Sequence, residues 1–198
     1  MRAFIAIEMP APVQQRLLAT QRRLTQHLRP QQLDRCVRWT PAENLHLTLR
    51  FLGEINDVQQ RDLTQHLTQI AQRHARLTLS IAGVGCFPNA HRPNVIWCGL
   101  RGELTALTQL QAEVEAAAQA IGLPAETKPF KPHLTIGRLQ RNATSSQLQA
   151  VGAAAMQLAV ATPQVEYDAS TVNELLFMRS ELTSSGPIYS RLGVFLLQ

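Results

Sequence analysis

The sequence predicts an α+β fold with a largely antiparallel sheet, and three observations carry this prediction. Several segments alternate apolar and polar residues and are rich in β-branched side chains, which is typical of strands. Other segments repeat apolar residues every three or four positions, which is typical of helices. Some predicted strands also follow one another directly, and this order favours antiparallel pairing over a parallel sheet with crossover helices.

The strand and helix patterns assign most of the chain. We predict strands at residues 2–9, 36–40, 44–53, 76–87, 94–100, 133–139, 169–180 and 189–197. We predict helices at residues 10–30, 56–74, 103–122 and 145–159. The second helix can be capped by Asn56 or Asp57, and the third ends where Gly122 precedes Pro124. Residues 184–190, "SSGPIYS", are predicted to form a turn before the last strand.

The predicted elements form an approximate internal duplication. Each half contains strands and helices in a similar order, and each has one strand with a His-x-Thr motif. The first motif is "HLTL" at residues 46–49, and "HLTI" follows 87 residues later at 133–136. We find no low-complexity segment or long linker, so we expect the halves to pack together in a single domain spanning residues 1–198.

Composition predicts a soluble protein, and its charge suits an anionic ligand without requiring one. The 198 residues are 45% hydrophobic, enough for a sizeable core. Lys and Arg number 19 against 14 Asp and Glu, giving a net charge of +5, although no basic run indicates a nucleic-acid arm. The apolar start is too short for a signal-peptide core and no stretch is long enough to cross a membrane, so we expect a cytoplasmic location. Three cysteines without a C-x-x-C pair predict reduced thiols.

The His-x-Thr spacing has a direct consequence on a strand. Side chains alternate between faces, so His46 and Thr48 point the same way, roughly 6.5 to 7 Å apart, while the neighbouring leucines point to the core. His133 and Thr135 repeat the arrangement. Two such strands facing each other across a cleft would surround one small anion with two imidazoles and two hydroxyls.

Chemistry at phosphorus fits this set of groups without a metal. Opening a cyclic phosphodiester needs a base that takes a proton from water and an acid that protonates the departing sugar oxygen. Histidine fills either role near neutral pH, and threonine hydroxyls can donate to the non-bridging oxygens. A single His-x-Thr strand is usually structural, because Thr favours strands, but two copies in equivalent places favour a catalytic pair.

The motifs and their surroundings resemble the 2H phosphoesterase family, and most of all its RNA 2′,3′-cyclic phosphodiesterase branch, also described as 2′-5′ RNA ligase. The resemblance runs from "RAFIAIEMP" through "WTPAENLHLTLRFLGE" and "FKPHLTIGR" to "LFMRSELTSSGPIYSRLGVFLL". It implies a bilobal α+β fold in which two pseudo-symmetric lobes each have a mainly antiparallel sheet and packed helices. The site, which needs no metal or other cofactor, would lie in the central cleft.

The same resemblance implies roles for the motif residues. His46 would match the proton donor and His133 the proton acceptor, with Thr48 and Thr135 holding the phosphate. The implied reaction is hydrolysis of an RNA terminal 2′,3′-cyclic phosphate to a 2′-phosphate, with reverse 2′-5′ RNA ligation as a secondary activity. The implied partner is such an RNA end, including those of tRNA-like fragments, and we expect the protein to act as a monomer.

Two arginines compete for the role of phosphate ligand. Alternation along an ideal strand aims Arg50 at the same face as His46 and Thr48. Arg138 is out of phase with His133, yet an Arg just after the second motif matches the family pattern, and Gly137 could mark a bulge that turns it inward. Both residues are therefore candidates.

Several residues near the motifs have either a structural or a functional interpretation. Lys131 could add positive potential, and Pro129 and Pro132 favour an extended approach to His133. Five aromatic residues could stack on a base but are more often part of a core: Phe4, Trp39, Phe51, Phe130 and Tyr189. The remaining histidines, His27, His66, His74 and His91, are predicted to lie on the surface.

Two alternative functions stay open at the level of the sequence. The first is a phosphodiesterase that acts on a small cyclic or 2′-5′ linked nucleotide. The second is a noncatalytic module that binds RNA ends through the same cleft. No H-E-x-x-H, P-loop or G-x-G-x-x-G motif occurs, so the sequence indicates no metal-protease, NTP-hydrolysing or dinucleotide site.

Overall fold

The computed structural model describes residues 1–161, 169–183 and 186–198. The helices are α1 (Ala11–Leu28), α2 (Asp57–Arg73), α3 (Leu104–Ala120) and α4 (Ser145–Ala161), with short 3-10 helices at Arg29–Gln31, Leu33–Cys36 and Ala42–Asn44. The strands are β1 (Arg2–Glu8), β2 (Val37–Trp39), β3 (His46–Glu54), β4 (Leu77–Phe87), β5 (Val95–Gly102), β6 (His133–Leu139), β7 (Ser170–Val172), β8 (Glu174–Thr183) and β9 (Gly186–Leu196).

All four predicted helices are confirmed. A capping box formed by Asn56 and Gln59 explains where α2 begins. Asn56 accepts a hydrogen bond from the backbone N–H of Gln59, and the Gln59 side chain accepts one from the backbone N–H of Asn56. This reciprocal pair satisfies two donors that the first turn of α2 would otherwise leave unpaired.

Two predictions near the C-terminus need correction. The single strand predicted at 169–180 is divided at Asn173 into β7 and β8, which pair with different neighbours. The turn predicted at 184–190 is shorter than expected, because Gly186 already pairs with Thr183 at the start of β9. Residues 184–185 of that turn lie outside the described residues.

The described strands form one continuous antiparallel sheet. Its order is β7-β4-β5-β6-β3-β1-β8-β9, and β2 pairs with β6. The resemblance implied a separate sheet in each lobe, but the two halves are joined where Leu47 of β3 pairs with Leu134 of β6. The β3–β6 junction is this one pair, and β2 pairs with the next part of the same β6 edge, at Gly137 to Leu139.

The sheet has a pseudo-twofold axis at this junction, and the strand registers show it residue by residue. Reading outward from the junction, β3-β1-β8-β9 on one side corresponds to β6-β5-β4-β7 on the other. The β1–β3 pair Ile7↔Leu47 corresponds to the β5–β6 pair Cys98↔Leu134. In the same way, Ala6↔Thr48 corresponds to Trp97↔Thr135, and Phe4↔Phe51 corresponds to Val95↔Arg138. The internal duplication predicted from the sequence is therefore confirmed.

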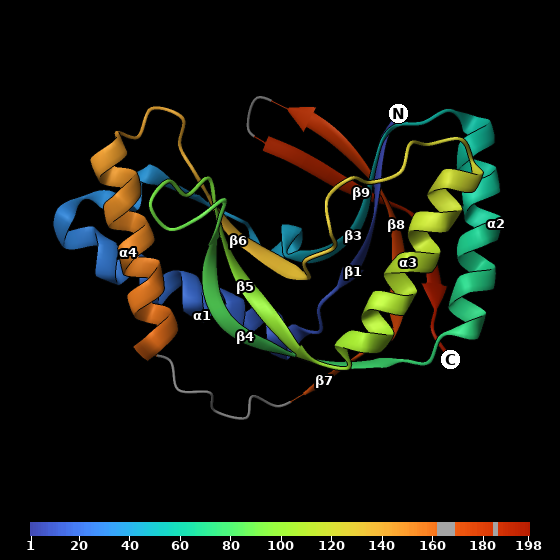
Figure 1. Cartoon of the computed structure of the whole chain (residues 1–198), viewed down its shortest axis with the longest axis horizontal. Coiled ribbons are helices and arrows are strands. Elements are labelled where there is room, and N and C mark those ends of the chain that lie inside the picture. Colours follow the sequence, from blue (N-terminus) through green and yellow to red (C-terminus); the bar gives the residue numbers. More distant parts are fainter. Residues whose placement is uncertain (162–168, 184–185) are drawn as a thin grey trace.

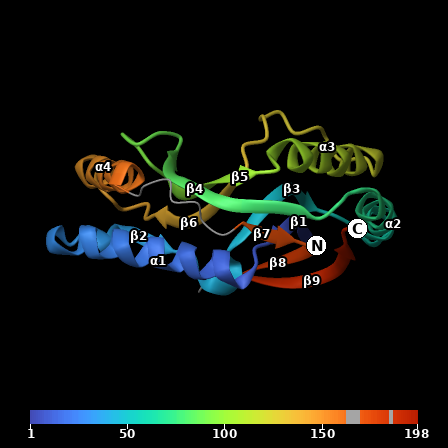
Figure 2. The same ribbon diagram turned by 90° about the horizontal axis from the view of Figure 1, so that it is seen from below.

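Each half of the sheet is covered by two helices. Figures 1 and 2 show α1 and α4 together at one end of the molecule and α2 and α3 together at the other. The helix after β1 crosses to the other half, where α1 contacts β6, and the helix after β5 crosses in the same way, where α3 contacts β3. No helix among residues 1–161, 169–183 and 186–198 is long and apolar enough to cross a membrane.

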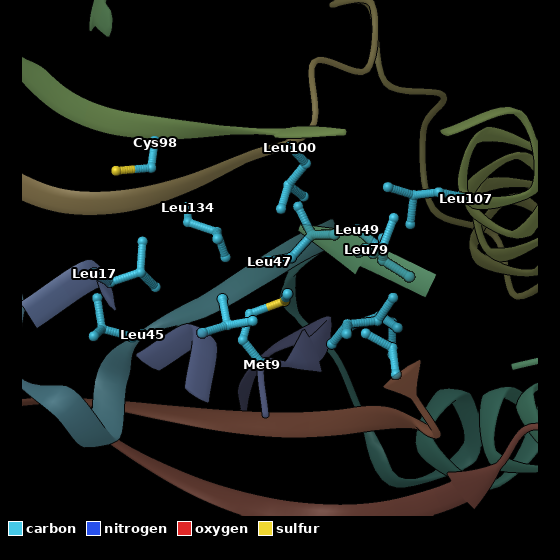
Figure 3. Close-up of a cluster of buried hydrophobic side chains, with 14 of the residues drawn as sticks. Met9, Leu17, Leu45, Leu47, Leu49, Leu79, Cys98, Leu100, Leu107 and Leu134 are labelled. Atoms are coloured by element: carbon cyan, nitrogen blue, oxygen red, sulfur yellow. The ribbon is translucent and has the colours of Figure 1, made fainter. Parts of the chain in front are cut away.

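The core lies under the junction of the two halves. Leu47 and Leu134 are fully buried, and Figure 3 shows them in one cluster with Leu17 of α1 and Leu107 of α3. Burying each such side chain is worth about 1.5 to 3 kcal/mol. The middle residue of each His-x-Thr motif thus fixes its strand to the core, leaving His and Thr on the opposite face.

Candidate active site

The two motifs meet on one face of the sheet. Because Leu47 pairs with Leu134 in an antiparallel register, His46 lies toward Thr135 and Thr48 toward His133. The histidines occupy one diagonal of this set and the threonines the other. In a regular antiparallel pair, diagonal positions are about 7 to 8 Å apart. All four side chains are half-buried and line one cleft.

The cleft encloses about 730 Å³ and has two unlike walls. Arg2 lines the cleft from β1, in the sheet half that carries Phe51. Arg38 and Arg138, from the paired strands β2 and β6, form one wall. Exposed apolar residues line the other, on β3 and the β8–β9 hairpin: Phe51, Leu182 and Ile188. A small anion with an apolar substituent matches this division.

His133 is held with a defined ring orientation. Its Nδ1 lies 2.7 Å from the backbone carbonyl of Lys131, which accepts the Nδ1–H hydrogen bond. The edges of Phe87 and Trp97 contact the ring, with centroids 4.9 and 6.4 Å away. In the neutral ring this leaves the Nε2 lone pair free to accept a proton. Lys131 contributes through its carbonyl, and its side chain is not among the cleft-lining residues.

His46 is enclosed by aromatic rings. Phe4 stacks on it at 4.9 Å, and Tyr189 approaches edge-on at 5.4 Å. Burial lowers the pKa of His46 to about 4, a hydrogen bond to the Asn44 backbone opposes this shift, and the charge of Arg138 lowers the pKa further. In the free protein at neutral pH, His46 is therefore uncharged.

Arg138 enters the cleft because β6 has a bulge after the second motif. The β5–β6 register passes from Trp97↔Thr135 to Ile96↔Gly137, so Ile136 has no partner and the alternation shifts by one residue. The bulge predicted at Gly137 is confirmed. A Cβ atom at Gly137 would lie 2.8 Å from Val37 and 3.1 Å from Trp39, so the close approach of β2 requires glycine there.

Arg50 is turned away from the cleft by the equivalent bulge in β3. Leu49 has no partner between Ala6↔Thr48 and Ile5↔Arg50, so the expectation from strict alternation fails for Arg50. The residue that corresponds to Arg138 under the pseudo-twofold axis is Phe51, which does line the cleft.

Arg50 instead ties the cleft strand to the segment after α3. Its side chain is only 8% exposed, and its Nε lies 2.6 Å from a carboxylate oxygen of Glu115. Its terminal nitrogens donate to the carbonyl oxygens of Phe51 at 2.8 Å and Pro124 at 2.5 Å. These contacts commit the guanidinium to structure and leave Arg138 as the motif-adjacent arginine in the cleft.

Both bulges are held by a glutamine from a crossover helix, which the sequence reasoning missed. Gln21 of α1 is buried and donates to the carbonyl oxygens of Ile136 and Thr40, each at 2.8 Å. Gln111 of α3 donates to the carbonyl oxygen of Leu49 at 3.4 Å. A polar residue on an otherwise apolar helix face was the available signal for Gln21.

The remaining predicted residues separate into cleft and core. Phe4, Trp39, Phe51 and Tyr189 line the cleft, whereas Phe130 packs against the core. Of these, Phe51 is the most exposed. His27 and His91 are exposed and His66 is half-buried, but His74 departs from the surface prediction because its Nε2 pairs with Glu113 at 3.0 Å.

The three cysteines are buried in the protein. Cys36, Cys86 and Cys98 are free and buried, which confirms the prediction of reduced thiols. Burial raises the pKa of Cys86 to about 11 and that of Cys98 to about 12, so neither is a reactive thiolate. In the part of the chain that the structure describes, no three His, Cys, Asp or Glu side chains are placed to hold a metal ion.

Comparison with curated proteins gives relatives that cover most or nearly all of the chain. The RNA 2′,3′-cyclic phosphodiesterase of Methanothermobacter thermautotrophicus is 29% identical over 99% of this chain and 98% of its own. The RNA 2′,3′-cyclic phosphodiesterase of Aquifex aeolicus is 31% identical over 81% of each chain.

Solved structures share the fold. A crystal structure of a Thermus thermophilus protein superposes with a TM-score of 0.76 at 28% identity, covering 100% of this chain and 98% of the other. Escherichia coli LigT complexed with 3′-AMP gives a TM-score of 0.72 at 25% identity, covering 99% and 97%.

A family model completes the comparison and reproduces the duplication. The model described as LigT like Phosphoesterase matches residues 7–97 and 101–189. Each matched segment contains one His-x-Thr motif. The first segment supplies β3 and the end of β1 to one half of the sheet and β4 to the other, and the second supplies β6 to one half and β8 to the other. The chain therefore belongs to the LigT-like phosphoesterases of the 2H phosphoesterase family.

Proposed function

We propose that this protein is a metal-independent RNA 2′,3′-cyclic phosphodiesterase that produces a 2′-phosphate end. The observation that carries the proposal is the antiparallel placement of the two motifs, with two histidines on one diagonal and two threonines on the other. Acid and base on opposite sides of one phosphorus atom are what in-line displacement requires. The names of the relatives support the choice of substrate.

The proposed step balances without a cofactor. A water oxygen attacks phosphorus while its proton passes to Nε2 of His133. The bond between phosphorus and the 3′ oxygen breaks, and that oxygen takes a proton from His46. Thr48 and Thr135 donate to the non-bridging oxygens, where Arg138 adds positive charge. If a 5′-hydroxyl replaces water as the nucleophile, the same groups would form a 2′-5′ bond.

The donor role of His46 depends on the bound substrate. In the free protein its pKa is about 4, mainly because burial disfavours the charged ring. A phosphate anion beside the ring favours the protonated form and raises this pKa. Substrate binding would thereby favour protonation of His46, and the 3′ oxygen would take this proton as it leaves.

Single substitutions test the two roles. We expect His46→Ala and His133→Ala each to lower kcat by about 100-fold or more, the usual scale for losing a general acid or base, with a much smaller change in RNA binding. His27→Ala, on the exposed surface of α1, is the matched control and should keep full activity. Equal losses of binding and turnover would instead favour the noncatalytic RNA-end binding module.

A substrate with sulfur in place of the 3′ bridging oxygen separates donor from acceptor. A thiolate leaves without protonation, so His46→Ala should recover much of its activity on this substrate. His133→Ala should stay inactive, because water still needs a base. Recovery by His133→Ala alone would reverse the two assignments.

A phosphodiesterase for small nucleotides is the second candidate. The observation that favours it is that Escherichia coli LigT was solved with 3′-AMP, a single nucleotide, bound to it. The cleft of about 730 Å³ would accept a nucleotide of this size. Comparing mononucleoside cyclic phosphates with short RNAs distinguishes the two substrates.

A further inference from the structure

A second pocket adjoins the cleft on its basic side. It encloses about 770 Å³ and is lined by Arg38, Asn94, Arg138, Leu139, Gln140 and Arg141. Arg38 and Arg138 line both the cleft and this second pocket. The two spaces therefore meet at this pair of arginines, and we call the second one the arginine pocket.

The arginine pocket concentrates positive charge that nothing described in the protein neutralises. Arg38 and Arg138 are direct cross-strand partners in the β2–β6 pair, and like charges placed opposite each other destabilise a sheet. No carboxylate among the described residues forms an ion pair with Arg38, Arg138 or Arg141. Such a cluster is stabilised when it binds an anion.

The two walls of the cleft also differ in chemical character. Its far wall presents Phe51, Leu182 and Ile188, which are 56%, 68% and 55% exposed. Exposed apolar side chains of this kind suit a nucleobase. Arg38 and Arg138 on the other wall open into the arginine pocket, so a chain of nucleotides bound with its end at the histidines can continue into a basic space there.

We propose that the arginine pocket binds the backbone phosphate on the 5′ side of the terminal nucleotide, and that Arg141 contacts this phosphate. The inference rests on the proposed function. A 2′,3′-cyclic phosphate is the 3′ end of an RNA, so every other phosphate of the substrate lies on its 5′ side. A mononucleoside cyclic phosphate carries one anionic group, which the His-x-Thr pair already holds. The second anion site therefore serves RNA longer than one nucleotide.

The test compares two substrates in one variant. Arg141→Gln keeps a polar side chain and alters a residue that lines the arginine pocket but not the cleft. We expect kcat/KM for a dinucleotide ending in a 2′,3′-cyclic phosphate to fall by roughly 10-fold, the scale of one charge-assisted hydrogen bond. The value for the corresponding mononucleoside 2′,3′-cyclic phosphate should not change. Arg61→Gln, exposed on the distant α2, carries the same charge change and is the control.

The salt dependence gives a second readout. For the dinucleotide, the slope of log kcat/KM against log salt should become shallower by about 0.7 in Arg141→Gln, the value for one lost contact to a single-stranded phosphate. Equal losses on both substrates, or no loss on either, would overturn the proposal.

The experiment also separates this inference from the proposed function. If the native protein turned over neither substrate, the proposed function would fail, and equilibrium binding of a dinucleotide carrying a 2′-phosphate would still test the pocket. Weaker binding of that dinucleotide by Arg141→Gln, with unchanged binding of the mononucleotide, would support the anion site. Unchanged binding of both would overturn it.

Discussion

At the scale of single residues, the environment of His46 links the cleft to the stability of the fold. Phe4 and Tyr189 cover the imidazole, and burial is the main reason that its pKa falls from 6.5 to about 4. A ring that folds in the neutral form resists protonation, because the charged form would lose its hydration. Burial of this histidine therefore costs the folded protein stability at acid pH.

Stability should therefore depend on the protonation of His46 between pH 6.5 and pH 4. Its folded pKa lies below the unfolded value, so the unfolded chain binds more protons in this window. The contribution is complete above pH 6.5 and is lost as the pH falls toward 4, by about 3 kcal/mol in total. We expect His46→Asn to lose less stability than the native protein between pH 7 and pH 4.5, measured by urea unfolding. The same loss in both proteins would contradict the low pKa.

The sequence was informative for the motif residues and misleading for Arg50. Strict alternation predicted that His46 and Thr48 face the same way, because one residue, Leu47, separates them within a regular stretch. It failed two residues later, where Leu49 has no cross-strand partner and the phase shifts. Gly137 signalled the equivalent shift in β6, because glycine is common at bulges. Arg50 carries no such signal, and its ion pair with Glu115 depends on a helix 65 residues away in the chain.

At the scale of elements, the two bulges are the features that aim side chains into the cleft. At each bulge a glutamine from a crossover helix donates to a backbone carbonyl oxygen: Gln21 to Ile136 and Gln111 to Leu49. The Ile136 carbonyl also accepts from the backbone N–H of Thr40 at 3.0 Å. The bond from Gln21 is shorter, at 2.8 Å against 3.4 Å, and the same Nε2 also donates to Thr40. Because α1 reaches across the junction, one half of the sheet depends on a helix that follows a strand of the other.

Replacing Gln21 should destabilise the protein more than replacing Gln111. Methionine has a similar volume but cannot donate a hydrogen bond, so Gln21→Met removes this donor from the buried bond to Ile136 and the part-buried bond to Thr40. We expect a loss of about 1 to 3 kcal/mol in the free energy of unfolding, measured by urea denaturation. Gln111→Met removes one long bond and is the matched control, with a smaller loss. Equal losses, or a larger loss for Gln111→Met, would argue against the bulge at Ile136 as the more tightly held one.

At the scale of the whole molecule, the duplication explains how one cleft obtains two histidines and two threonines. The pseudo-twofold axis passes near the pair Leu47 and Leu134, so each half contributes one histidine and one threonine. The two copies have since diverged around this shared frame. At the equivalent positions 51 and 138, one half has Phe51 and the other Arg138, which gives the cleft one apolar and one basic wall.

The order of elements was predictable from periodicity, but the way the halves join was not. Apolar patterns repeat along each strand and helix, and they identified the duplication. The two halves join into one sheet through a single residue pair, Leu47 with Leu134. One pair produces no repeating pattern of residues, so the sequence did not indicate the junction. The arginine pocket was missed for the same reason, since Arg38 and Arg138 become neighbours only when β2 pairs with β6.

The central claim is that two histidines from the two halves open an RNA 2′,3′-cyclic phosphate without a metal. The most direct test is to incubate the purified protein, in excess EDTA, with a short RNA that ends in a 2′,3′-cyclic phosphate and to resolve the products. We predict a 2′-phosphate at a rate that EDTA does not change, because the leaving group is the 3′ oxygen and the catalytic groups are side chains. A 3′-phosphate product, or loss of activity with EDTA that added metal restores, would contradict the mechanism.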